Sequence, residues 1–90
     1  MNYIKLEINK VARYDLDVIV DHLKTTLDED PIVDYFGDVW LHCKTQKDLV
    51  SEAFCLGTVY NELEEKFDIA SPFILSYHEL ENPVQKVVLK

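Results

Sequence analysis

The chain has 90 residues, of which 48% are hydrophobic and 11% aromatic, with 17 acidic against 9 basic side chains and a net charge of −8. This composition is typical of one globular domain over residues 1–90 and excludes a disordered acidic tail. The negative charge argues against nucleic acid or an anionic membrane as the direct partner, because both are themselves negatively charged.

The sequence contains no recognisable targeting or membrane-spanning segment. Its apolar runs fall far short of the roughly 20 residues that a transmembrane helix needs. The first residues alternate too strictly between polar and apolar side chains for a signal peptide. Two cysteines, Cys43 and Cys55, without such a signal favour a reducing, cytoplasmic compartment.

The first half of the chain predicts a strand, a helix and a pair of strands. Residues 3–9 alternate, as a strand with one buried face does. Apolar side chains recur at helical spacing over residues 15–27, and the first residue of this segment is an aspartate, which can cap a helix N-terminus. Short strands are expected at residues 32–36 and 39–44, with Gly37 adopting a positive φ in the tight turn between them.

A long helix is predicted from about Gln46 to Lys66. Thr45 and Asp48 at its start have the spacing of a capping box. Gly57 is expected on the apolar side, where a missing side chain would let the helix approach the sheet closely. The apolar stripe consists of Leu49, Ala53, Leu56, Tyr60, Leu63 and Phe67 and is widened by Val50 and Gly57.

The last segment allows two structures. Residues 73–80 fit a strand, which we favour, although Ser71 and Pro72 could instead begin a short helix over residues 72–81. Either way, residues 84–89 are expected to form a terminal strand. The order of elements predicts an α+β two-layer sandwich of the ferredoxin-like type, β-α-β-β-α-β, with an additional C-terminal strand or short helix.

Negative charge is concentrated on the first helix and on the segment after it. Residues 14–43 contain eight carboxylates, and Lys24 is their only lysine or arginine. Some of these carboxylates lie near the C-terminus of the predicted helix, where the helix dipole disfavours negative charge. We expect this surface to bind a basic protein partner, as an inhibitor or immunity-type protein does, without enzymatic activity. The alternative is that the charge only keeps a small protein soluble. The expected partner-binding residues are Asp17, Asp21, Asp28, Glu29, Asp30, Asp34 and Asp38.

A second hypothesis concerns the sheet face turned away from the helices. Strand alternation places Tyr3, Trp40 and His42 there, and tryptophan and tyrosine favour the centres of interfaces. This face would pair two copies of a structural or regulatory subunit in a homodimer. Alternatively, the C-terminal segment covers it, through Phe73 or Tyr77.

Metal-binding and catalytic motifs are absent from the sequence. The histidines and cysteines form no C-x₂-C or H-x₃-H pair, and the adjacent His42 and Cys43 would point to opposite faces of a strand. No nucleophile, acid and base occur at a recognised spacing, so no metal and no cofactor are expected. Cys43 is expected to be a small core residue, whereas Cys55 is expected opposite the apolar stripe beside Glu52. Together with Phe54 and Val59, Cys55 would mark a second contact surface. The side chains that could in principle bind a metal, for which no site is expected, are His22, His42, Cys43, Cys55 and His78.

Overall fold

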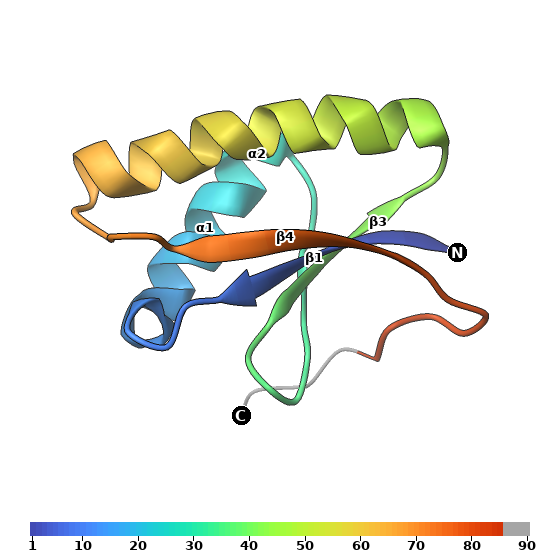
Figure 1. Ribbon diagram of the computed structural model, residues 1–90, viewed down its shortest axis with the longest axis horizontal. Helices are drawn as coiled ribbons and strands as arrows, with labels where there is room; N and C mark the ends of the chain where they lie inside the picture. Colours follow the sequence, from blue (N-terminus) through green and yellow to red (C-terminus); the bar gives the residue numbers. More distant parts are fainter. Residues whose placement is uncertain (86–90) are drawn as a thin grey trace.

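The computed structural model of the protein describes residues 1–85, apart from the side chain of Gln46. Four strands form one antiparallel sheet in the order β2-β3-β1-β4, and two helices complete a small α+β domain (Figure 1). In chain order the elements are β1 (Asn2–Ile8), the 3₁₀ turn η1 (Ala12–Asp15), α1 (Leu16–Leu27), β2 (Ile32–Val33), β3 (Val39–Cys43), α2 (Gln46–Lys66) and β4 (Phe73–Glu79).

The core lies between the sheet and the two helices. In the central strand β1, Leu6 stands between Val39 of β3 and Leu75 of β4, so three apolar side chains point to the same face of the sheet. Both helices pack against this face and supply its other half. The fully buried side chains of this core include Ile4, Leu6, Ile19, Leu23, Val39, Leu41, Leu56, Val59 and Leu63.

The first helix is confirmed, but the predicted capping of its N-terminus by the Asp15 side chain is wrong. Asp15 occupies the N-cap position, yet its side chain makes no capping hydrogen bond. The reason is that α1 continues directly from η1, whose backbone already folds into helical turns. At the other end, Asp28 adopts a left-handed backbone conformation with φ of 53°, and its N–H donates to the carbonyl of Lys24.

The second helix and its capping box are confirmed, but its buried face differs from the predicted stripe. The Thr45 side chain accepts from Asp48 N, and the Asp48 carboxylate accepts from Thr45 N, both at 3.2 Å. Val59 and Glu52 are buried, whereas Gly57 points away from the sheet, with no atom within 4 Å of an added Cβ. Leu56 and Leu63 of the predicted stripe are fully buried, so the buried face overlaps that stripe but is rotated from it toward Glu52 and Val59.

The turn between β2 and β3 is wider than predicted. Gly37 has the expected positive φ, at 81°. β2 stops at Val33, however, because the Asp34 side chain accepts hydrogen bonds from the N–H groups of Phe36 and Asp38. These bonds hold the backbone in a turn where the sequence pattern predicted more strand.

Residues 73–79 form a strand, as favoured, and the alternative helix is wrong. β4 pairs along the whole of β1, from Asn2 opposite Glu79 to Ile8 opposite Phe73. The additional C-terminal strand expected at residues 84–89 lies mostly outside the described residues, and residues 84–85 are not in a strand. Across residues 1–85, neither helix has the length and apolar character that crossing a membrane requires.

Candidate functional site

Five of the predicted partner-binding carboxylates are exposed on α1 and the loop that follows it. Within the described residues, this acidic surface has one ion pair, between Lys24 Nζ and Asp30 Oδ1 at 3.3 Å. Among the described residues, Asp17, Asp21, Asp28 and Glu29 therefore have no ion pair. The acidic surface consists of Asp17, Asp21, Asp28, Glu29 and Asp30.

The position of Asp28 is unfavourable for helix stability. Its left-handed backbone is tolerated by aspartate better than by most residues, although glycine or asparagine would serve as well. Its carboxylate stands at the negative end of the helix dipole, where anions are destabilising. Asp17, in the first turn, is the only member of the acidic surface that the dipole stabilises. Helix stability therefore does not explain this charge distribution.

Asp34 belongs to the turn and contributes no free carboxylate. Its Oδ1 accepts from the N–H groups of Phe36 at 2.9 Å and Asp38 at 3.0 Å, and its Oδ2 accepts from Trp40 Nε1 at 2.8 Å. The resulting turn holds Tyr35 and Phe36 out in solvent, 85% and 73% exposed. The carboxylate expected to meet a partner instead shapes the turn.

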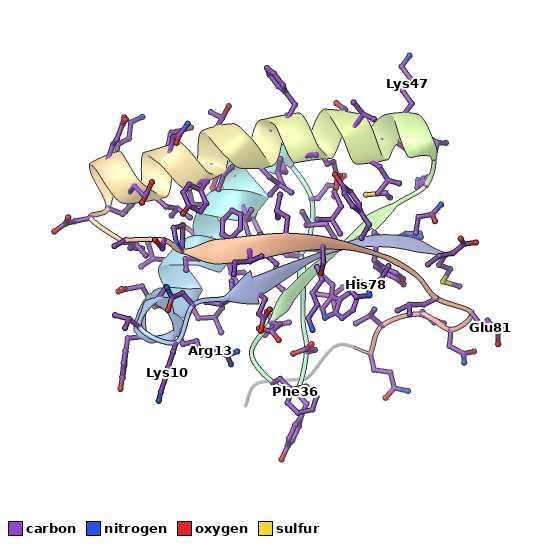
Figure 2. All side chains as sticks on the ribbon, viewed as in Figure 1. Lys10, Arg13, Phe36, Lys47, His78 and Glu81 are labelled. Carbon is purple, nitrogen blue, oxygen red and sulfur yellow. The ribbon has the colours of Figure 1, made fainter. Side chains whose placement is uncertain are left out.

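Asp38 is buried, so its assignment to a partner-binding surface is wrong. The residue is 5% exposed, and its carboxylate lies 3.0 Å from Arg13 Nη2 and 3.7 Å from Lys5 Nζ. It also accepts a hydrogen bond from Ile8 N at 3.2 Å. Arg13 in addition donates to the carbonyl of Phe36, and Figure 2 shows Arg13 and Phe36 at the lower edge of the molecule. Asp38 therefore joins β1 to the turn.

The sheet face away from the helices is covered more fully than an open interface would be. Tyr3 is 2% exposed, and its hydroxyl accepts a hydrogen bond from Val84 N at 3.2 Å. Its ring meets Trp40 edge to face at 5.9 Å and lies 5.1 Å from His42. His78, visible on this side in Figure 2, lies 5.1 Å from Trp40. The segment after β4 thus provides part of the cover.

The cover does not come from the aromatic residues that the sequence suggested. Phe73 lies on the helix side, where its ring meets Tyr60 edge to face at 5.4 Å. Tyr77 stands opposite Ile4 on that same side and is 61% exposed. Of the three residues proposed for a sheet interface, His42 is exposed and Trp40 half-buried, while Tyr3 is buried and unavailable.

A buried polar pair beneath α2 was missed by the sequence analysis. Cys43 Sγ donates to Glu52 Oε2 at 3.2 Å, between β3 and α2. Burial raises the pKa of Glu52 to about 7, and the neighbouring carboxyl of Glu29 adds to the effect. Burial also raises the pKa of Cys43 to about 12, helped by Glu52. The position of Glu52, four residues before Leu56, was the signal that it shares the buried face.

This pair borders a surface pocket of about 380 Å³ between α1, β3 and α2. Its lining includes Glu29, His42, Lys44, Glu52 and Cys55. The Cys43 thiol stays protonated near neutral pH, so it is a poor nucleophile and a poor metal ligand. Glu52 exchanges a proton near pH 7, which makes the pair sensitive to pH.

Histidine and cysteine do not gather into a metal site. Across residues 1–85, no group of three or more His, Cys, Asp or Glu side chains is placed to hold a metal ion. His22 lies against Phe67, with its Nε2 3.6 Å from Glu62 Oε2, far along α2 from the Cys43 pair. No protein-family model, curated protein or solved structure matches this chain.

Proposed function

We propose that this chain is a non-enzymatic protein-interaction module whose acidic surface binds a basic protein partner. The observation that carries this proposal is the set of five exposed carboxylates, which within residues 1–85 form one ion pair, that of Asp30 with Lys24. Asp28 and its neighbours stand where the helix dipole disfavours them, so this charge is maintained at a cost to the helix. A binding role explains why that cost is tolerated.

The kind of partner follows from the charge. Proteins that bind nucleic acid present lysine and arginine side chains to phosphates, and a row of carboxylates offers the same cations an alternative counterion. Bound there, the acidic surface would exclude nucleic acid and so act as an inhibitor. Opposite charge also speeds diffusional encounter, an advantage for a protein that must intercept its target.

We further propose that the fold is of the ferredoxin-like type and that the protein works in a reducing cytoplasm. The strand order β2-β3-β1-β4, antiparallel at each step, supports the first point, together with helices α1 and α2 on one face of the sheet. The second is supported by Cys43 and Cys55, which are both free thiols.

The test is a binding experiment with the acidic surface neutralised. The protein is immobilised and incubated with lysate of its source cells, the column is washed at low and then high salt, and retained proteins are identified and purified. Binding of the purified basic protein is then compared between the unmodified chain and the triple variant Asp17→Asn, Asp21→Asn, Asp28→Asn. We expect affinity to fall at least about tenfold in the variant and to fall with rising salt, because exposed charges are screened.

A matched control removes the same charge elsewhere. Glu65, Glu79 and Glu81 are exposed and lie outside the acidic surface, so their change to glutamine should leave affinity nearly intact. Equal losses in both triple variants would mean that only net charge matters, and an unchanged affinity in the first would refute the proposal. Inhibition is measured separately, as displacement of a labelled oligonucleotide from the purified partner.

A further inference from the structure

The outer side of α2 carries a stripe that the acidic surface does not explain. One side of the helix covers the sheet, and the opposite side faces away from both the sheet and α1 (Figure 1). On that side Val50 and Phe54 are 73% and 81% exposed. Gly57 follows them, with open space where a Cβ would stand. Two large exposed apolar side chains beside a glycine that leaves open space for another side chain are typical of a contact surface.

The stripe has the spacing of a helix that pairs with another helix. Its members are separated alternately by three and four residues, the interval at which side chains form a single seam between two helices. All of them are exposed, and Figure 2 shows Lys47, the first, projecting away from the sheet. The seam consists of Lys47, Val50, Phe54, Gly57, Asn61 and Glu64.

A second copy of this same helix complements the seam when it runs antiparallel. If a twofold axis passes midway between Phe54 and Gly57, the phenyl ring of each copy lies over the glycine of the other. The same register places Lys47 opposite Glu64 at both ends. A parallel pair would instead oppose Lys47 to Lys47 and Glu64 to Glu64, which is repulsive. Size and charge therefore select the same antiparallel arrangement.

We infer that the protein forms a twofold-symmetric dimer through the outer side of α2, with the seam of one copy antiparallel to that of the other. This inference goes beyond the proposed binding of a basic partner and does not depend on it. From Lys47 to Glu64 the seam is about 26 Å long. A single helix pair buries less than the roughly 800 Å² per partner of a standard interface, so we expect a dissociation constant of about micromolar size.

Sedimentation equilibrium over a wide range of protein concentration tests the dimer directly. The unmodified chain should pass from 10.5 kDa toward twice that mass as its concentration rises. Phe54→Gln should weaken dimerisation at least about tenfold, because it removes the ring at the centre of the seam. Since Phe54 is mostly exposed, this variant should unfold at nearly the same temperature as the unmodified chain in dilute solution. A chain that stays monomeric up to about millimolar concentration would overturn the inference.

Charge reversal tests the antiparallel register. Lys47→Glu and Glu64→Lys should each weaken the dimer, because each creates like-charged pairs at both ends, and the double variant should restore it. Glu64 also accepts a hydrogen bond from Ser71 N at 3.3 Å, so Lys47→Glu is the cleaner single variant. Lys10→Glu makes the same change of charge away from α2 (Figure 2) and should leave the dimer intact.

Two results would contradict the arrangement even if a dimer forms. A double reversal that fails to restore dimerisation would exclude the pairing of Lys47 with Glu64. A dimer that survives Phe54→Gln but dissociates with Trp40→Ala would place the interface on the sheet face around Trp40 and His42 instead.

Discussion

The thiol of Cys43 donates a hydrogen bond to the carboxylate of Glu52 across the interface between β3 and α2, over a Sγ to Oε2 distance of 3.2 Å. Both residues are buried, at 2% and 9% exposure. A carboxyl group in such a place is more easily kept neutral than charged, which is why its pKa rises to about 7. The stability of the fold should therefore depend on pH in a way that one substitution can remove.

Glu52→Gln should abolish a loss of stability that the unmodified chain suffers as pH rises. The folded pKa of Glu52 lies above the ordinary value of 4.5, so its contribution is fully present below about pH 4.5 and is lost as pH rises through about 7. Between about pH 5 and pH 8, the free energy of unfolding of the variant relative to the unmodified chain should increase by about 2 kcal/mol. Urea denaturation at several pH values measures this difference.

The control for this experiment is Glu65→Gln, which changes an exposed carboxylate on the same helix. Its stability should follow that of the unmodified chain across the pH range. If Glu52→Gln also follows the unmodified chain, Glu52 does not hold its proton in the folded state, and the account of this pair is wrong.

The two cysteines should differ in reactivity. Burial and the neighbouring Glu52 raise the pKa of Cys43 to about 12, so almost no thiolate forms near neutral pH. Cys55 is half-buried and lines the adjacent pocket. Iodoacetamide should label Cys55 of the native protein at least about tenfold faster than Cys43, as peptide mass spectrometry would show. In denaturant the two rates should converge, and equal rates in the native protein would contradict the buried pair.

Asp38→Ala should destabilise the fold strongly. The substitution leaves Arg13 and Lys5 without their shared carboxylate and Ile8 N without its acceptor. We expect the free energy of unfolding to fall by about 3 kcal/mol, as for other buried ion pairs that lose one partner. Asp21→Ala on the exposed side of α1 should change it by less than about 0.5 kcal/mol. Similar small losses in both variants, measured by urea denaturation, would show that the Asp38 contacts contribute little.

Gly37→Ala should also lower stability, by about 1 kcal/mol, because alanine is strained at a φ of 81°. The new methyl group would stand 3.1 Å from Arg13 Nη1, at the end of a flexible side chain, so the backbone strain should dominate. Gly37→Asn is the informative comparison, since asparagine tolerates this backbone region better and should lose less. Thermal unfolding of the two variants ranks them, and an equal loss would point to the contact with Arg13 rather than to the backbone.

Local chemistry made most of the elements predictable from the sequence. The capping box of Thr45 and Asp48 involves residues three apart, and the alternation that predicts β1 lies within seven residues. Gly37 was predictable for the same reason, because a tight turn demands a particular backbone region at one position. Such patterns are determined within a few residues and do not depend on the rest of the chain.

Burial of charge was not predictable, because it depends on segments that meet only in the folded protein. Asp38 is buried since Arg13 and Lys5, more than twenty residues earlier, reach its carboxylate. Tyr3 is covered by a segment some eighty residues later, through the hydrogen bond from Val84. Counting apolar residues along α2 likewise placed Glu52 on the wrong side, because the geometry of the sheet decides which side of the helix is buried.

The position of β1 at the centre of the sheet has a consequence for folding. β1 precedes β3 by about thirty residues and β4 by about seventy, and β4 is the partner with which it pairs along its full length. Contacts over such long loops form slowly. Until residues 73–79 arrive, the edge of β1 that will meet β4 has unpaired backbone groups able to capture a strand of another chain. Aggregation during refolding should therefore begin at this edge, and a chain cut after α2 should be the most prone to it.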